Sequence, residues 1–350
     1  MSLTSTQIHA YRLRNPGQHS GMGKIIALGE ALIDFMPRET GVSLAEVSGF
    51  IKAPGGAPAN VAVCASRLGA KAMVITQLGT DAFGDYLTQI ICEAGVDVSA
   101  ILRTDEAPTS LAFVSLKADG ERDFLFYRSP AADLMLEPES IEERWFSSGD
   151  ILHFCSVALA GEPMRRSHSR AIELAQKRGM MVSFDVNLRF PLWNDAEELR
   201  RMVMCFLPGV SLLKAGHEEL SFLTGEDHDA GIAKILELVP SVLVTYGKNG
   251  AALFSKGRRV FHPGYDTPAV DTTGAGDAFI GSFLTSLLES QVVDVLSLSD
   301  GSVYKMLERA HAVASLVVAS KGAMNAMPNM DQVNRFIAEH HVSMLEVSGN

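Results

Sequence analysis

The chain has 350 residues, of which 47% are hydrophobic and 20% charged, a composition typical of globular rather than disordered proteins. Its formal net charge of −11 disfavours general nucleic-acid binding, although a local nest of backbone N–H groups can still hold a single nucleotide. No window reaches the roughly 18 consecutive apolar residues that a membrane helix needs. We therefore expect neither a nucleic-acid partner nor a membrane span.

The cysteine pattern gives no sign of a metal or disulfide framework. The four cysteines are widely spaced and form neither a CxxC motif nor a Cys/His cluster, which makes a zinc site unexpected. Free thiols favour a reducing compartment. We predict a cytoplasmic protein whose thiols are all free, at Cys64, Cys92, Cys155 and Cys205.

The first 23 residues contain no acidic residue and little apolar periodicity. They also lack the hydrophobic segment of a secretory signal. We predict that residues 1–23 are a disordered or vector-derived tail. An organelle transit peptide is the alternative, since acid-poor segments with Arg12 and Arg14 resemble one.

From Lys24 onward, short apolar strands alternate with helical segments, which is typical of a parallel sheet covered by helices. We predict an α/β fold with a doubly wound, mostly parallel central sheet and helices on both faces. The predicted strands are 24–28, 73–78, 151–154, 181–185, 212–214 and 242–245, and the predicted helices are 59–68, 84–93, 278–288 and 309–320.

Two segments, 35–54 and 108–129, interrupt this alternation because they show strand patterns without helices between them. Within the second segment, a hairpin is predicted around the turn at 118–120. We expect both segments to form a small β-sheet lid over a site, and the exposed edges of its strands predict a homodimer. Residues 24–34, 55–107 and 130–340 then form the α/β core.

The strongest chemical signal is the segment DTTGAGD over 271–277, which runs directly into an apolar helix. The small residues Gly274, Ala275 and Gly276 let backbone N–H groups approach an anion at the positive end of that helix. Asp277 could serve only as the helix N-cap. A carboxylate beside an anion nest also suits the acceptance of a proton from a hydroxyl that attacks a phosphorus.

The sequence DTTGAGDAF resembles the C-terminal signature of the PfkB/ribokinase family of carbohydrate and nucleoside kinases. GGAPANVA at 55–62 resembles the other family signature, and GEALID at 29–34 is most similar to the fructokinase branch. The matching motifs follow the family order from Ile25 to about Pro328. This resemblance implies a ribokinase-like fold with a β lid, ATP and Mg²⁺ as cofactors, and phosphorylation of a sugar hydroxyl.

The resemblance also implies residue roles on the sugar side. Asp277 is the catalytic base, and the amides of residues 274–276 hold the transferred group. Asp34 is expected at the end of the first strand, although an aspartate in a loop is common, and Asn60 could instead cap its helix. The predicted sugar-binding residues are Asp34, Gly55, Gly56, Asn60, Phe113, Arg128 and Arg189.

On the nucleotide side, the resemblance implies that Glu219 orients Mg²⁺ through water, although Gly216 stands where the family usually has Asn or Ser. The carbonyls of Asp271 and Thr273 correspond to a position that often holds K⁺ in relatives. The predicted ATP-binding residues are Asn187, Lys214, Thr245, Gly247, Gly250, Gly322 and Ala323.

Several alternatives are weighed against this interpretation. The chain has no GxxxxGK[ST] motif and no GxGxxG after its first strand, which excludes P-loop and Rossmann dinucleotide sites. The resemblance of GEALID and GGAPANVA to fructokinase motifs favours D-fructose as the substrate, converted to fructose 6-phosphate. A 2-keto-3-deoxygluconate kinase stays open because Arg128 and Arg189 could bind a carboxylate, and a ribose or nucleoside kinase is the third possibility. A catalytically silent kinase-like binding protein is expected to lack Asp277 or Asp34, and both are present.

Overall fold

The computed structural model of the protein describes residues 23–39, 41–116, 122–292 and 294–340. The predicted tail up to residue 22 and the predicted hairpin turn at 118–120 lie outside these residues.

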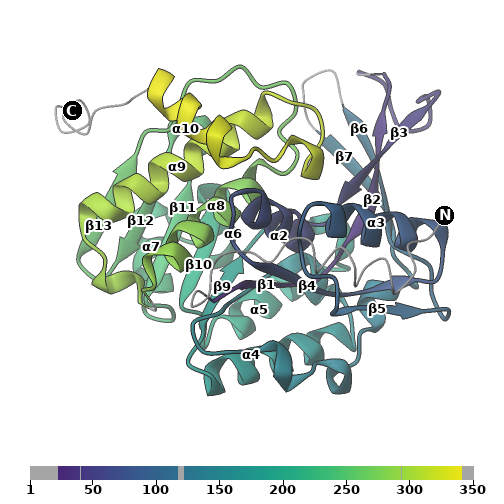
Figure 1. Cartoon of the computed structure of the whole chain (residues 1–350), viewed down its shortest axis with the longest axis horizontal. Coiled ribbons are helices and arrows are strands. Elements are labelled where there is room, and N and C mark those ends of the chain that lie inside the picture. Colours follow the sequence, from purple (N-terminus) through teal and green to yellow (C-terminus); the bar gives the residue numbers. More distant parts are fainter. Residues whose placement is uncertain (1–22, 40, 117–121, 293, 341–350) are drawn as a thin grey trace.

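A nine-stranded sheet forms the centre of the molecule, in the order β13-β12-β11-β10-β9-β8-β1-β4-β5 (Figure 1). The strands from β11 to β5 pair in parallel, and β12 and β13 add an antiparallel edge. This confirms the predicted mostly parallel sheet. The strands are β1 (Ile25–Leu28), β4 (Ala72–Gly79), β5 (Ile101–Thr104), β8 (Ile151–Cys155), β9 (Met181–Asp185), β10 (Leu212–Gly216), β11 (Ser241–Thr245), β12 (Ala251–Ser255) and β13 (Arg258–His262).

Helices cover both faces of this sheet because its central strands are apolar on both sides. In β1, Ile25 and Ala27 enter one hydrophobic core, whereas Ile26 and Leu28 enter the other. The first core is covered by α2 (Ala57–Arg67), α3 (Ala82–Glu93), α8 (Ala275–Ser290), α9 (Asp300–Val318) and α10 (Met330–Glu339). The second is covered by α4 (Met164–Lys177), α5 (Ala196–Phe206), α6 (His217–Thr224) and α7 (His228–Leu236).

A separate four-stranded sheet projects from one side of the core (Figure 1). Its order is β3 (Phe50–Gly55), β2 (Leu32–Pro37), β6 (Leu111–Leu116) and β7 (Arg122–Tyr127). Strands β6 and β7 pair antiparallel, as the predicted hairpin requires. Because β2 begins at Leu32 and β3 ends at Gly55, the sheet extends slightly beyond the predicted segment 35–54. Its action as a lid stays a prediction.

The chain reverses its direction across the main sheet between β1 and β8. It first runs from β1 to β4 and β5, and later from β8 outward to β13 on the other side. In open α/β sheets, ligands bind outside the carboxyl ends of the strands at such a reversal. The fold therefore places the expected site beyond the ends of β1, β8, β9 and β10.

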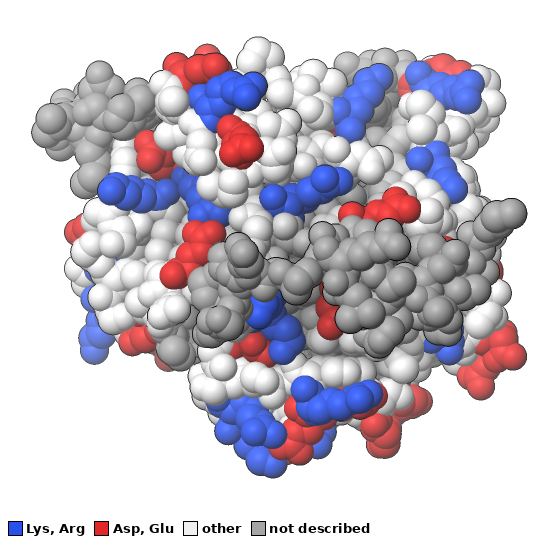
Figure 2. All heavy atoms as spheres, in the orientation of Figure 1, with Lys and Arg blue, Asp and Glu red and all other residues white. Residues whose placement is uncertain are grey.

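The surface carries charges of both signs. On the face seen in Figure 2, acidic and basic side chains are interspersed. Among the described residues, no helix is long and apolar enough to cross a membrane.

Candidate active site

Two cavities meet at the DTTGAGD turn. The first has a volume of about 150 Å³ and lies between the carboxyl ends of the central strands and the small sheet. The second has a volume of about 280 Å³ and extends from the turn between α8 and α9. Both are lined by Thr272 and Gly276. A group bound in one cavity can therefore lie next to a group bound in the other at this turn.

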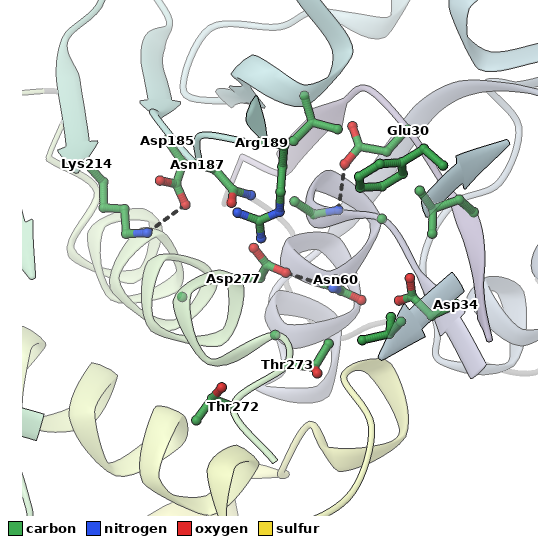
Figure 3. Close-up of a pocket in the computed structure, with 18 residues that line it drawn as sticks. Glu30, Asp34, Asn60, Asp185, Asn187, Arg189, Lys214, Thr272, Thr273 and Asp277 are labelled. Carbon is green, nitrogen blue, oxygen red and sulfur yellow. Dashed lines mark hydrogen bonds and ion pairs between the residues drawn. The ribbon is translucent and has the colours of Figure 1, made fainter. Parts of the chain in front are cut away.

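Polar side chains from four different parts of the chain converge in the first cavity (Figure 3). Asp34 comes from β2, Asn60 from α2, Arg189 from the loop after β9, and Asp277 from α8. Four of the polar side chains predicted to act on the sugar side thus line one cavity.

Asp277 is not a helix cap, because Gly274, with a φ of 77°, occupies the N-cap position of α8. The Oδ2 atom of Asp277 instead accepts a hydrogen bond of 2.7 Å from Nδ2 of Asn60. Asn60 does not cap its own helix either, since the N-cap of α2 is Gly56. Burial raises the pKa of Asp277 above its ordinary value, although Asn60, Lys214 and Arg189 lower it. A carboxylate with a raised pKa is a stronger base than a solvated one.

Asp271 shapes the turn. Its Oδ1 accepts hydrogen bonds from N and Oγ1 of Thr273, at 2.9 and 2.6 Å, and its Oδ2 accepts one of 3.0 Å from N of Gly322. A Cβ atom at Gly274 would lie 2.6 Å from Cβ of Ala323. Gly322 and Ala323 therefore pack against the turn and do not line either cavity, so their predicted contacts with ATP stay a prediction.

The prediction that Asp34 ends the first strand of the main sheet is wrong, because β1 already ends at Leu28. It lies inside β2 of the small sheet, in register with Ala53 and Ala112. Its side chain nevertheless lines the cavity. Ala53 and Ala112 lie on the same face of the sheet as Asp34, and their small side chains leave room for its carboxylate.

The two glycines predicted to bind the sugar, Gly55 and Gly56, have different positions relative to the cavity. Gly55 does not line the cavity, but a Cβ atom there would lie 2.1 Å from Oδ2 of Asp34, so glycine leaves room for that carboxylate. Gly56 lines the cavity with a φ of 102°, and a Cβ atom there would lie 2.4 Å from the Glu30 carbonyl oxygen.

Two predicted sugar contacts from the small sheet are not at the cavity. Phe113 faces the opposite side of its sheet, where it stacks on Phe35 at a centroid distance of 4.8 Å. Side chains alternate along a strand, so Val114 and Phe126 form the apolar wall instead. Arg128 is buried and forms an ion pair with Asp133, which leaves it behind the cavity wall.

The second cavity is more apolar. Of the predicted ATP-binding residues, Thr245, Gly247 and Gly250 line it, whereas Asn187 and Lys214 line the first cavity. Sequence reasoning missed His311, which also lines this cavity. Burial and the neighbouring His262 lower the pKa of His311 to about 3. The other missed lining residues include Tyr265, Phe279, Ala314 and Val318.

Two acidic residues at the first cavity were also missed. Glu30 follows β1, and its Oε1 accepts a hydrogen bond of 2.9 Å from N of Ala57. Asp185 ends β9 and forms an ion pair of 2.9 Å with Lys214. Burial raises the pKa of each carboxyl to about 7. Their position at the carboxyl ends of central strands was the sequence signal that could have revealed them.

Glu219 lies at the start of α6. Its two carboxylate oxygens accept hydrogen bonds from N of Leu188 at 2.8 Å and N of Gly216 at 2.7 Å. Within the described residues, no group of three or more His, Cys, Asp or Glu side chains could hold a metal ion. The role of Glu219 toward Mg²⁺ therefore stays a prediction of contact through water.

A polar cavity with the buried carboxylate of Asp277, joined at a turn of small residues to a larger apolar cavity, is the arrangement expected of a small-molecule phosphotransferase. The sequence matches the profile of the pfkB family carbohydrate kinases over residues 22–330. The chain belongs to this family, whose members transfer a phosphoryl group to a sugar hydroxyl.

Individual relatives agree with this assignment. A probable fructokinase-2 of Arabidopsis thaliana is 41% identical over 312 residues, which cover 87% of this chain and 93% of the relative. The crystal structure of fructokinase with bound ATP from Xylella fastidiosa has a TM-score of 0.80 at 35% identity, covering 90% of this chain and 98% of that one. The fructokinase of Vibrio cholerae O395, in a form with fructose, ADP and calcium ion bound, has a TM-score of 0.82 at 34% identity and covers 91% and 99%.

Proposed function

We propose that this protein is a fructokinase that transfers the γ-phosphoryl group of ATP to the 6-hydroxyl of D-fructose. One observation carries the proposal: Asp277 lies where the polar cavity reaches the turn that it shares with the apolar cavity. The fructokinases named above support the choice of sugar, because one of them binds fructose and ADP and another binds ATP.

In the proposed step, fructose lies in the first cavity with its 6-hydroxyl at Asp277. The hydroxyl oxygen forms a bond to the γ-phosphorus, and the bond to the β–γ bridging oxygen breaks with its electron pair left on ADP. The hydroxyl proton passes to Asp277. The backbone amides of residues 274–276 stabilise the phosphoryl oxygens, since they lie at the positive end of α8.

The sugar-binding roles divide between charged and neutral groups. Oδ1 of Asn60 is buried without a hydrogen-bond partner among the described residues, so it is suited to accept a hydrogen bond from a sugar hydroxyl. Asp34 offers carboxylate acceptors from the small sheet, and Arg189 offers a cation near Asp277. Closure of the small sheet over the cavity would exclude water and limit ATP hydrolysis.

We propose Mg²⁺ as the divalent ion that accompanies ATP. Glu219 would contact it through water, which fits its place next to the cluster of Asp185, Lys214 and Asp277. When bound, the ion neutralises charge on the β- and γ-phosphates. We also propose K⁺ binding by the carbonyls of Asp271 and Thr273, since the side chain of Asp271 already fixes that turn.

The structure bears on the alternative substrate class. A sugar acid such as 2-keto-3-deoxygluconate needs a cation for its carboxylate. Arg128 is neutralised by Asp133 behind the cavity wall, so Arg189 and Lys214 are the cations that line the first cavity among the described residues. Arg128 is therefore not available to the carboxylate of a sugar acid, whereas Arg189 is, and the choice of fructose rests on the fructokinases named above.

The test is a panel assay of ATP-dependent phosphorylation with fructose, ribose, 2-keto-3-deoxygluconate and nucleosides. We expect the highest kcat/KM with fructose and identification of the product as fructose 6-phosphate. A higher kcat/KM for any other member of the panel would replace fructose as the substrate. Turnover of none of them would reject the proposed reaction.

We further propose a homodimer formed through the small sheets and a cytoplasmic location. Exposed apolar side chains on this sheet, at Ile51, Leu125 and Tyr127, support the dimer. The location rests on the four cysteines, none of which forms a disulfide in the part of the chain that the structure describes.

A further inference from the structure

Asp185 and Lys214 form a buried ion pair at the junction of the two cavities (Figure 3). Asp185 is 2% exposed and Lys214 7% exposed, and their charged atoms are 2.9 Å apart. Such a pair is expensive to bury, and hydrophobic residues of similar volume are often equally stable in its place. Its presence at the cavity wall therefore calls for a reason other than stability.

The ammonium group of Lys214 lies over the turn that both cavities share. A Cβ atom at Gly276 would be 3.2 Å from Nζ of Lys214, and Gly276 lines both cavities. A phosphoryl group that passes from the nucleotide cavity to the sugar cavity must cross this turn. Glycine at position 276 leaves the space between the ammonium group and the turn open.

Asp185 is placed to hold this ammonium group. It ends β9, next to β10, which carries Lys214 in direct register with it. Oδ2 of Asp185 accepts the hydrogen bond from Lys214, whereas Oδ1 is buried without a partner among the described residues. The carboxylate thus fixes the position of the cation and lies beside the region where the phosphoryl group crosses.

We propose that Asp185 is a positioning residue for phosphoryl transfer: it holds the ammonium group of Lys214 above Gly276, where this cation stabilises the phosphoryl group during its passage between the cavities. The inference rests on the proposed function. It also fits the presence of Gly216, which offers no side chain to the phosphates.

The surrounding charges predict how Asp185 acts. Burial alone would lower the pKa of Lys214, but the carboxylates of Asp185, Glu219 and Asp277 raise it above its ordinary value. His153 on β8 is neutral, since burial and Lys214 lower its pKa to about 3. Among the residues that the structure describes, Asp185 is the carboxylate in hydrogen-bond contact with Lys214. Its neutralisation must therefore lower the pKa of Lys214.

The experiment is a double-mutant cycle with Asp185→Asn and Lys214→Met, read as kcat for the sugar that the wild-type enzyme turns over fastest. We expect each single variant to lose about 10²-fold in kcat, the size of loss seen when one transition-state donor is removed. The double variant should lose no more than Lys214→Met alone, because Asp185 acts through Lys214. Additive losses would overturn the proposal and assign Asp185 an independent role.

The pH profile separates positioning from a structural role. In Asp185→Asn, kcat should fall at high pH as Lys214 loses its proton. Because the pKa of Lys214 is lowered in this variant, the fall should occur at lower pH than in the wild type. Asp185→Asn combined with Lys214→Arg should lack the shift, because a guanidinium stays protonated. An equal loss of kcat at every pH in Asp185→Asn would reject the proposal.

The matched control is the ion pair between Lys24 and Asp150, which lies outside both cavities at 2.6 Å. Asp150→Asn should lower Tm without changing kcat or its pH profile. If Asp185→Asn does not fold, the double variant, which removes both charges together, is compared with Lys214→Met. A wild-type protein inactive on every sugar would instead reject the proposed function.

Discussion

Nδ2 of Asn60 donates a hydrogen bond of 2.7 Å to Oδ2 of Asp277, although 217 residues separate them in the chain. The contact joins α2 to α8, two helices that pack on the same face of the main sheet. Asn60 thereby connects the two family signatures: one carries the proposed base and the other the residue that orients it.

Asp277→Asn should lower kcat by about 10²- to 10⁴-fold, the range that general-base catalysis contributes. Asn keeps the size of the side chain but cannot take the proton of the attacking hydroxyl. ATP affinity should be unchanged, because the backbone amides of the turn are retained. Steady-state kinetics and calorimetric ATP titration measure the two quantities.

Asp195→Asn is the matched control for this variant. Asp195 caps α5 by accepting a hydrogen bond from N of Glu197, and it lies outside both cavities. Since Asn is also a good N-cap, this variant should keep both Tm and kcat. Retained turnover in Asp277→Asn would remove Asp277 as the base.

Asn60→Ala should change the pH dependence of the reaction. The hydrogen bond from Asn60 lowers the pKa of Asp277, so its removal should raise that pKa further. Activity is lost as the pH falls through the pKa of the base, and the acid limb of kcat/KM should therefore move to higher pH. A hydrogen bond to a charged group contributes about 1.5–3 kcal/mol, so kcat/KM should also fall roughly 10- to 150-fold. An unmoved acid limb would contradict the coupling.

The sequence predicted the main sheet well because its central strands are short apolar runs at regular spacing. It did not predict β5, β12 or β13, which lie at or near the edges of the sheet. The helix predicted at 309–320 is α9, which begins at Asp300 because the side chain of Ser299 caps it there. Edge strands and capped, polar first turns carry little apolar periodicity, so a pattern of buried residues alone cannot locate them.

Site residues were predicted correctly where a sequence motif fixes the position of the backbone. They were missed where the pairing of distant strands decides which side chains face the cavity. Asp277, Asn60 and Gly276 follow from their motifs. Phe113 was assigned to the cavity because its residue type suits an apolar wall, yet the pairing of β6 with β7 turns it to the opposite face. Arg128 was assigned to substrate because it follows the predicted lid hairpin, and nothing in the sequence marks Asp133 as the partner that it binds instead.

Gly55→Ala should weaken sugar binding without affecting ATP. A Cβ atom at this position would lie 2.1 Å from Oδ2 of Asp34, so the carboxylate must move. We expect the KM for the sugar to rise at least about tenfold, the effect of losing about 1.4 kcal/mol from hydrogen bonds to Asp34. The KM for ATP should stay constant. Initial rates with each substrate varied in turn measure both constants.

Gly301→Ala provides the control for this variant. Gly301 lies in α9 with no atom within 4 Å of an added Cβ, so alanine should leave the KM values unchanged and stabilise the protein by about 0.5–1 kcal/mol. An unchanged sugar KM in Gly55→Ala would show that Asp34 does not bind the sugar or can shift without loss.

Glu30→Gln should change how stability depends on pH. Burial raises the pKa of Glu30 from 4.5 to about 7, so its contribution to stability is complete below pH 4.5 and lost as the pH rises to about 7. Gln keeps the acceptor for N of Ala57 and removes the ionisation. Across this window, the free energy of unfolding of the variant relative to the wild type should increase by about 3 kcal/mol, measured by urea denaturation. A difference that is constant with pH would contradict this assignment.

Lysine substitutions on the small sheet should dissociate the proposed dimer. Ile51 is 56% exposed on the same face as Asp34, and Leu125 is 47% exposed on the other face. Burying a lysine charge at an interface is costly, so Ile51→Lys combined with Leu125→Lys should give a monomer by light scattering at concentrations where the wild type is a dimer. Leu238→Lys, which replaces an exposed leucine outside this sheet, should stay dimeric. A wild type that is monomeric up to about 100 μM would exclude this interface. A dimer that survives the paired substitutions would exclude it too, since apolar contacts on these strands cannot tolerate two buried ammonium groups.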